Sequence, residues 1–151
     1  MKLMQFALEN VVLASQRKRL YGVNKMVLTL NDILNISPIL HKLSKQTFQG
    51  KTVFQIARLI KLVDEELNTL DTARQKIIDK YGEKDEKGQL IVSENGQVHV
   101  SPANTDSCNQ EFYELLSTEV NIDASPLSLS CFDSVELTPN EALLLGKIVE
   151  D

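Results

Sequence analysis

The residues best placed to do chemistry lie between positions 83 and 94. Two carboxylates, a glycine, an apolar residue and a closing glutamate follow the spacing of an EF-hand calcium loop: Glu83, Asp85, Gly88, Leu90 and Glu94. Two features oppose a calcium site. Lys87 places a cation where that loop needs a ligand oxygen, and an Asn-Gly turn follows Glu94 in place of the required helix. The sequence therefore predicts a solvated acidic turn here and no metal site.

The other chemically capable side chains are scattered along the chain. His41 and His99 are isolated, and Cys108 and Cys131 stand 23 positions apart with no CxxC pair. Residues 64–66 are three adjacent carboxylates, which diverge by about 100° per position on a helix and so form a solvated face. No nucleotide-binding glycine loop occurs, and nothing fixes a Ser/His/Asp geometry. We expect no catalytic residue, no cofactor, two reduced thiols and no enzymatic activity.

Charge is unevenly distributed between the two halves of the chain. Residues 1–63 carry ten Lys/Arg and two Asp/Glu, a net charge of +8, whereas residues 64–151 carry six and nineteen, a net charge of −13. This polarity favours head-to-tail self-association or a charged partner. The alternative is that two solvated faces are separate in sequence and mix in the fold.

The dense basic cluster Arg17, Lys18 and Arg19 is a candidate interaction site for phosphate or for an acidic protein surface. A solvated helix end is the simpler interpretation. Aromatic residues make up 5% of the chain and Trp is absent, which argues against a nucleic-acid-binding platform. The apolar run at the N-terminus is interrupted by Glu9 and Asn10, and no stretch reaches 18 apolar residues. We therefore expect a soluble intracellular protein with no membrane partner.

Two parts are expected: an N-terminal arm or helix at 1–25, for which a strand is the alternative, and a single α+β domain at 26–151. Alternating residues predict a strand at 27–30, followed by a helix that Asn31 caps. Pro38 is expected to mark a kink or a second short helix capped by Ser37.

Residues 52–82 predict one long helix, with Thr52 as its N-cap and Gly82 as its C-terminal stop. Apolar residues recur at spacings of three and four along it, and the stripe narrows in the second half. The narrow part is a candidate interaction seam formed by Leu70, Arg74, Ile77 and Tyr81. We expect this half to contact a second chain. The alternative is one long helix packed along a small sheet.

The remaining elements are shorter. A β-hairpin is expected at 89–93 and 97–101 around Asn95-Gly96, then a helix at 107–117 and a strand at 118–122. Thr138 and Glu141 form a capping box that predicts a C-terminal helix. No internal repeat is apparent. The fold class is α+β: one long helix packed on a small, mainly antiparallel sheet, with a β-hairpin and short flanking helices.

The runs KMVLTLNDILNISPILHKLSKQ, ARQKIIDKYGEKDEKG and LLSTEVNID carry a resemblance that covers residues 25–151. The sequence resembles a family of small uncharacterised proteins of tailed phages and prophages of Gram-positive bacteria. The resemblance implies a phage-encoded protein made in the host bacterial cytoplasm. It implies no catalytic residue, because that family has no assigned activity.

These observations favour a non-enzymatic protein that acts through protein–protein contact, with itself or with a host or phage protein. The first hypothesis is a virion or assembly component that forms a homo-oligomer. The alternative hypothesis is an inhibitor that binds a host anti-phage defence protein. Its acidic half would then occupy a basic, nucleic-acid-binding site.

Overall fold

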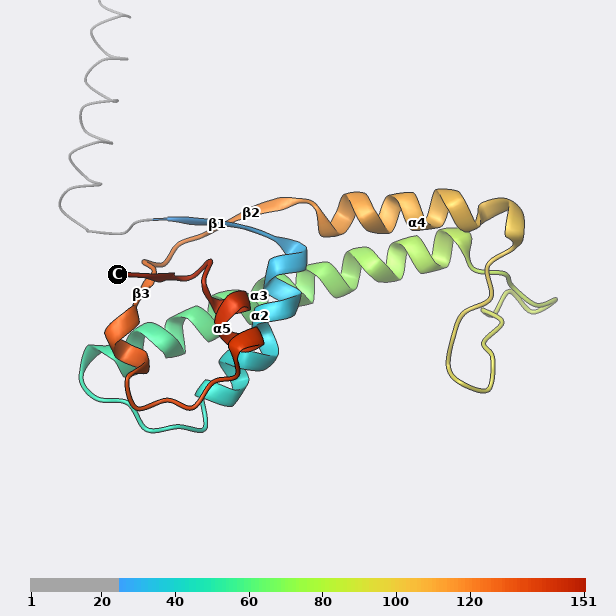
Figure 1. Ribbon diagram of the computed structural model, residues 1–151. Helices are drawn as coiled ribbons and strands as arrows, with labels where there is room; N and C mark the ends of the chain where they lie inside the picture. Colours follow the sequence, from blue (N-terminus) through green and yellow to red (C-terminus); the bar gives the residue numbers. More distant parts are fainter. Residues whose placement is uncertain (1–24) are drawn as a thin grey trace, which may run out of the picture.

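The longest element of the computed structural model is helix α3 (Lys51–Tyr81), which runs through most of the molecule (Figure 1). The structure describes residues 25–151. At 1.5 Å per residue, α3 is about 46 Å long, so it extends well beyond the elements that pack around its first half. The predicted long helix is confirmed, with Gly50 at its N-cap position instead of Thr52.

The described chain consists of three parts. The stalk consists of the second half of α3 and helix α4 (Pro102–Leu116), and the tip is the segment 82–101 that joins them. The head contains the first half of α3 with the remaining described elements: β1 (Met26–Thr29), α2 (Leu30–Leu43), β2 (Glu119–Ile122), β3 (Leu127–Ser128), the 3-10 helix η1 (Leu129–Phe132), α5 (Pro139–Leu145) and β4 (Val149–Glu150).

The strands of the head form two small sheets. β1 pairs antiparallel with β2, with Met26 opposite Ile122 and Thr29 opposite Glu119. β3 pairs parallel with β4, with Leu127 opposite Val149. The α+β class is confirmed, but the expected sheet is wrong in detail. The segment predicted as a hairpin lies at the far end of the stalk (Figure 1), so it cannot join the 26–29 and 119–122 strands in one sheet.

The core of the head lies where α2 crosses the first half of α3. Ile33, Ile36 and Leu40 repeat at spacings of three and four, which places them on one face of α2, and all three are buried. Leu59 and Val63 cover them from α3. Among residues 25–151, no helix is both long enough and apolar enough to cross a membrane.

Helix α2 begins and continues differently from the expectation. Its N-cap is Thr29, whose hydroxyl accepts the backbone N–H of Asp32 at 3.1 Å, while the Asp32 carboxylate accepts the N–H of Thr29 at 3.0 Å. Asn31 is therefore not the cap. Pro38 lies inside one continuous helix, so the alternative of a second short helix capped by Ser37 is wrong. Burial of Ile36 and Ile39 on either side of Pro38 outweighs the loss of one backbone hydrogen bond.

Two ion pairs attach the C-terminal elements to α2. Lys42 pairs with Glu141 at 2.9 Å, and Lys147 pairs with Asp32. Glu141 also completes the predicted capping box with Thr138, which is confirmed. Partial burial by itself would raise the pKa of Asp32, but hydrogen bonds from Lys147 and Thr29 outweigh it and hold the pKa below its ordinary value.

The double role of Asp32 predicts a pH-dependent contribution to stability. Asp32→Ala should lower the free energy of unfolding at pH 7 by about 1–3 kcal/mol, because a helix cap and a charge-assisted hydrogen bond are both lost. A carboxylate with a lowered pKa stabilises the fold above its ordinary pKa and stops doing so as pH falls through the folded-state value. The difference from wild type should therefore shrink below pH about 4 in urea denaturation. Lys61→Ala, which removes an exposed pair, is the control. A difference that stays constant down to acidic pH would contradict this role.

Candidate functional site

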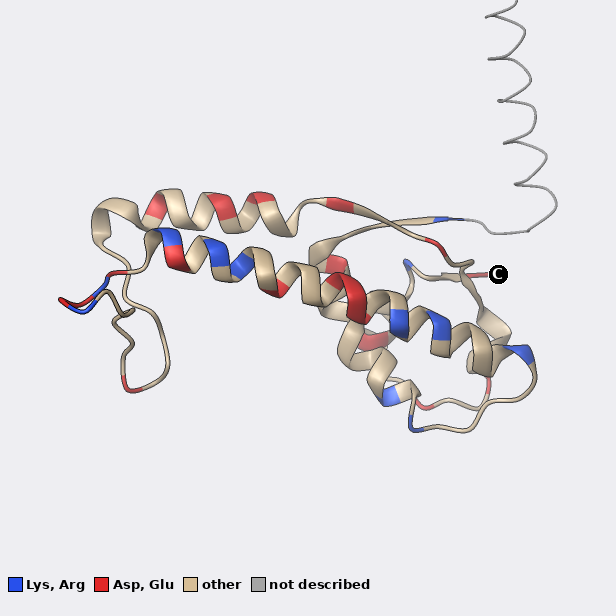
Figure 2. Ribbon diagram, turned by 180° about the vertical axis from the view of Figure 1, so that it is seen from behind, with Lys and Arg blue, Asp and Glu red and all other residues tan. Residues whose placement is uncertain are grey.

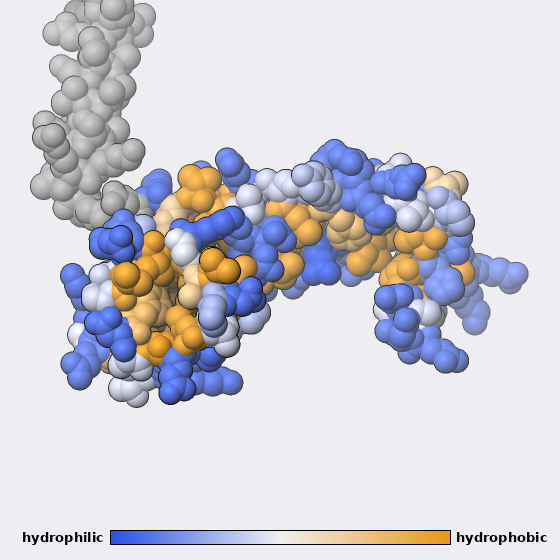
Figure 3. All heavy atoms as spheres, viewed as in Figure 1, coloured by the Kyte–Doolittle hydropathy of each residue, from blue (hydrophilic) through white to orange (hydrophobic). Residues whose placement is uncertain are grey.

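The stalk is an antiparallel pair of helices held by a narrow apolar seam (Figure 1). Leu70 and Ile77 are buried on α3, and Cys108 is buried on α4. Figure 3 shows hydrophobic atoms along the line where the two helices meet. Helix α4 of the same chain covers the predicted interaction residues Leu70 and Ile77. This removes the reason for expecting a second chain on that seam.

The other two predicted seam residues have different surroundings. Arg74 is exposed and lies 3.9 Å from the carboxylate of Asp71, whereas the neighbouring Ala73 is half-buried. On a helix with 3.6 residues per turn, positions 73 and 74 lie on opposite sides of the line from Leu70 to Ile77, and the partial burial of Ala73 indicates that α4 packs on the side of position 73. The heptad pattern therefore placed Arg74 on the seam incorrectly and missed Ala73.

Tyr81, the last predicted seam residue, fastens the end of α3 to α4. Its hydroxyl donates to Glu111 Oε1 at 2.6 Å, and Lys80 donates to the same oxygen. Hydrogen bonds from Lys80 and Tyr81 lower the pKa of Glu111, and the bond to Glu111 raises the pKa of Tyr81. These contacts lie at the base of the tip, so they hold the two chain segments that enter and leave it.

The tip is built around a closed ring of three backbone hydrogen bonds. The N–H of Glu83 donates to the carbonyl of His99 at 2.8 Å, and the N–H of His99 donates to Ile91 at 2.9 Å. The N–H of Ile91 then donates to Glu83 at 2.8 Å, which completes the ring. Successive members of the ring are eight residues apart in sequence. Three short segments thus meet edge to edge, and each bonds to both others.

This ring reveals an eight-residue repeat, so the prediction of a chain without internal repeats is wrong. DEKGQL at 85–90 and SENGQV at 93–98 occupy equivalent positions. In each copy, the backbone N–H of a glycine with positive φ donates to the carbonyl of the first residue of the copy. Gly88 donates to Asp85 and Gly96 donates to Ser93, both at 2.9 Å. A third turn of the same kind begins at Ser101, whose carbonyl accepts the N–H of Asn104 at 2.9 Å. Helix α4 begins at this turn. Two copies of a short, polar motif are too few for the repeat to be recognised from the sequence without the hydrogen bonds.

The interior of the tip requires a glycine at its first repeat position. Gly82, Leu90 and Val98 are equivalent in the repeat, and a Cβ added to Gly82 would lie 2.5 Å from Leu90 Cδ2 and 2.9 Å from Val98 Cγ1. Gly82 ends α3 as predicted, but its φ of −64° is not the left-handed conformation that a C′ glycine usually adopts. Its role is to leave room for the other two side chains.

The outer surface of the tip combines two apolar side chains with acidic turns. Ile91 is 37% exposed and Val92 is 52% exposed. The expected hairpin is reduced to the single bridge between Val92 and Val98 around the Asn95-Gly96 turn. The Asp85 carboxylate accepts the backbone N–H groups of Lys87 and Gln89 at 2.8 and 2.9 Å, so it closes a turn. Within residues 25–151, no three or more His, Cys, Asp or Glu side chains are grouped to hold a metal ion.

The remaining sequence candidates do not form a common site in the described part of the chain. His41 Nε2 lies 3.0 Å from Asp64 Oδ1 and links α2 to α3 on the surface of the head. Cys108 is buried in the stalk, where burial raises the pKa of its thiol, and Cys131 lies in η1 beside Thr52. Arg17, Lys18 and Arg19 fall outside the described residues, as does nearly all of the expected N-terminal element.

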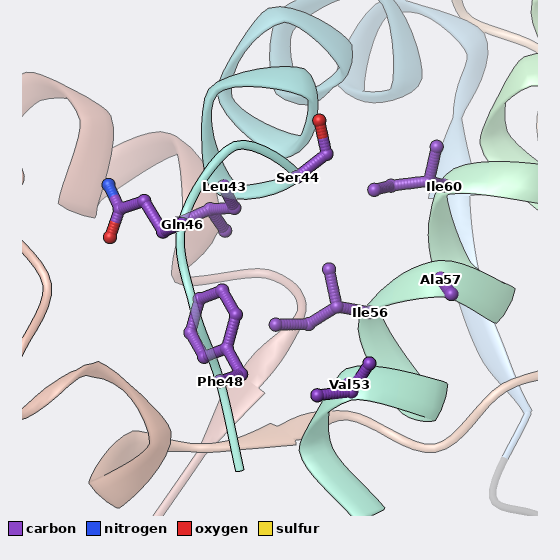
Figure 4. A pocket seen from close by; sticks show the side chains of 8 residues that line it. All are labelled: Leu43, Ser44, Gln46, Phe48, Val53, Ile56, Ala57 and Ile60. Carbon is purple, nitrogen blue, oxygen red and sulfur yellow. The ribbon is translucent and has the colours of Figure 1, made fainter.

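The head carries an open apolar pocket of about 150 Å³ at the other end of α3 (Figure 4). It lies between the end of α2, the loop that follows and the first turns of α3. Its lining consists of Leu43, Ser44, Gln46, Phe48, Val53, Ile56, Ala57 and Ile60. Val53 is 44% exposed at its edge. The pocket therefore offers a hydrophobic recess with few polar groups, which suits an apolar side chain from a partner.

The seam of the stalk predicts an intramolecular role for Ile77. Ile77→Asp should weaken the α3–α4 contact by about 3 kcal/mol or more, because it places an unpaired charge against α4. Amide hydrogen exchange in α4 should speed up by about 100-fold, and far-UV helicity should fall. Arg74→Asp, on the exposed face, is the matched control and should leave exchange almost unchanged. A change in oligomeric mass with unaltered exchange in α4 would instead show that the seam meets another chain.

The close approach at Gly82 predicts that the tip opens when this residue gains a side chain. In Gly82→Ala, the added methyl group would meet Leu90 and the carbonyl of Ile78 at 2.5 and 2.7 Å. We expect a local cost of about 1–3 kcal/mol and faster exchange at the three ring amides of Glu83, Ile91 and His99. Glu83→Ala changes an exposed side chain in the same segment and should not have this effect. Equal exchange in the two variants would contradict the packing argument.

Comparison with protein-family models, with curated proteins and with solved structures gives no significant match to this chain. The resemblance to phage and prophage proteins therefore stays a prediction from the sequence. The candidate site rests on geometry alone. It consists of a turn-rich tip with an exposed apolar pair, carried on a stalk, and an apolar pocket at the opposite end of α3.

Proposed function

We propose that this protein works by protein–protein contact and that the tip is its contact surface. The observation that carries the proposal is the placement of Ile91 and Val92. Both are exposed, although apolar side chains of this size are usually buried, and both lie at the end of a stalk that holds them away from the head. No sequence motif for catalysis accompanies them, so we infer a binding role in place of an enzymatic one.

The construction of the tip supports binding because its backbone is already ordered. The ring of hydrogen bonds fixes Ile91 in place, and the turns before and after it are closed by Gly88 and Gly96. The contacts of Glu111 with Lys80 and Tyr81 hold the base of the tip. A surface that is ordered before binding loses less conformational entropy when a partner attaches, so a small apolar contact gives a larger net affinity.

The sequence resemblance suggests the setting of this contact. We propose a component of phage particles or of their assembly, made in the host bacterial cytoplasm. Assembly proteins must join partners at fixed positions, and a rigid two-helix stalk fixes the distance between the tip and the head. The exposed apolar pair would then seat against a neighbouring protein of the particle, or against another copy of this chain.

Inhibition of a host defence protein is the second candidate, and the composition of α4 favours it. Asp106, Glu111 and Glu114 lie on this helix and Lys or Arg are absent from it, so Figure 2 shows red and no blue along α4. Such a surface is suited to a basic, nucleic-acid-binding site. Binding through acidic groups should weaken strongly between about 50 and about 300 mM salt, whereas binding through the apolar tip should change little.

The assembly role predicts that the tip is needed for incorporation into particles. Full-length wild-type protein should be found by quantitative mass spectrometry in purified particles from a producing culture. Ile91→Ser combined with Val92→Ser should reduce its amount at least about tenfold, which corresponds to the loss of about 1.4 kcal/mol or more of binding free energy. The reason is that the apolar contact area is removed while the backbone ring remains.

The control is Leu143→Ser, which changes a side chain that is 79% exposed on α5 in the head. This variant should be incorporated like wild type. Normal incorporation of the tip variant would show that the tip is not the contact surface. Absence of wild-type protein from the particles would reject the assembly role and leave the salt-sensitive inhibitor as the better explanation.

A further inference from the structure

The segment that lines the head pocket is basic, and carboxylates elsewhere in the head pair with only some of its cations. Residues 33–63, which supply all of the pocket lining, contain five Lys/Arg and no Asp or Glu. Three of these cations form ion pairs with carboxylates: Lys42 with Glu141, Arg58 with Asp123 and Lys61 with Glu65. No ion pair within residues 25–151 involves the other two, Lys45 and Lys51.

These two lysines lie beside the pocket in sequence. Lys45 stands between the lining residues Ser44 and Gln46, and Lys51 is two positions before Val53 in the first turn of α3. A lysine at the edge of an apolar recess attracts an acidic partner and excludes a basic one. The pocket therefore fits an apolar side chain whose neighbours are carboxylates.

The tip has the complementary composition. It carries four acidic residues, Glu83, Asp85, Glu86 and Glu94, and two lysines around the exposed Ile91 and Val92. No ion pair within the described chain involves any of these four carboxylates. Glu86 and Glu94 occupy the same position in the two copies of the repeat, so each turn carries one glutamate next to its apex. The tip thus presents an apolar pair flanked by carboxylates that form no ion pair within residues 25–151.

We propose that the tip of one copy of this chain docks in the head pocket of the next copy. Val92 and Ile91 enter or cover the apolar recess, and the turn glutamates face Lys45 and Lys51. This inference rests on the proposed function, because it uses the tip as the contact surface, and it names the partner as a second copy. A second copy is favoured over other proteins because both complementary surfaces occur on this one chain.

The two surfaces lie toward opposite ends of α3, so one molecule cannot join its own tip to its own pocket (Figures 1 and 4). The contact is therefore heterologous: each copy offers a tip to one neighbour and a pocket to another. Such contacts close into a ring or continue as an open chain, depending on the rotation between copies. Either form would place the basic segment 33–63 of one chain against the acidic tip of the next.

Complementation between two blocked variants tests this arrangement. Val92→Asp removes the apolar tip and adds a charge that the pocket cannot bury. Ala57→Glu places a carboxylate at the pocket on an exposed helix position, where it should not disturb the core. Light scattering after size exclusion should show that the mass of wild type rises with concentration and that each variant stays at the chain mass of 17.0 kDa.

An equal mixture of the two variants should form a dimer and stop there. The Val92→Asp chain keeps an intact pocket, and the Ala57→Glu chain keeps an intact tip, so one interface remains and cannot propagate.

The contribution of charge to the contact is tested by charge-reversal variants. Lys45→Glu with Lys51→Glu should weaken self-association at least about tenfold, and mixing with Glu86→Lys and Glu94→Lys should restore it. Leu143→Asp, at an exposed site elsewhere in the head, is the control and should associate like wild type.

Wild type that stays monomeric at high concentration would overturn the inference, and so would a mixture of the two blocked variants that stays monomeric. Association that neither variant weakens would also reject it, because another surface would then be responsible. These results leave the proposed function separately testable. A monomeric protein whose incorporation into particles still depends on Ile91 and Val92 would retain the tip as a contact surface for a different partner, whereas loss of that dependence would reject both.

Discussion

The structure depends on covering the apolar stripe of α3 along its whole length. Helix α2 and the elements packed on it cover the first half, through residues such as Leu59 and Val63. Leu70, which still belongs to the core cluster of the head, and Ile77, which does not, lie about two and four turns beyond Val63. If nothing covered that half, two large apolar side chains would be exposed to water at a cost of about 1.5–3 kcal/mol each. Helix α4 supplies the cover, and its return to the head creates the stalk.

The tip follows from the same constraint, because a chain that ends α3 and must return as α4 has to reverse direction. A short loop would be sufficient for that reversal. This chain uses twenty residues, 82–101, and orders them with a backbone ring, two glycine turns and a small interior formed by Leu90 and Val98. Because these interactions order the backbone of the tip, its outer side chains are presented in fixed positions. That is the physical reason for treating the tip, and not the helices of the stalk, as the recognition surface.

Charged side chains have two roles in the described part of this molecule: some form ion pairs between segments of the head, and others form no ion pair there and are open to a partner. Several ion pairs join segments distant in sequence, such as Lys42 with Glu141 and Lys147 with Asp32, and these hold the head together. Lys45 and Lys51 beside the pocket, and the four carboxylates of the tip, form no ion pair within residues 25–151. Exposed single pairs contribute little to stability, but unpaired charges of opposite sign on separate surfaces orient an encounter between molecules. The fold thus mixes part of the uneven charge of the two halves, since Lys42 and Arg58 of the first half pair with Glu141 and Asp123 of the second.

The sequence by itself determined the elements whose signals are local: the α+β class, the extent of α3, the capping box of Thr138 and the Asn95-Gly96 turn. Such features depend on helical periodicity, side-chain caps and glycine, which act within a few residues. Only the tertiary structure decided that α4 covers Leu70 and Ile77, that α2 continues through Pro38 and that Gly82 makes room for Leu90 and Val98. It also revealed the repeat at the tip and the pocket at Phe48, which no local pattern marks. Each of these results depends on contacts between segments that are far apart in sequence or on a hydrogen-bonded ring closed across three segments, so no window of neighbouring residues contains the interaction that decides it.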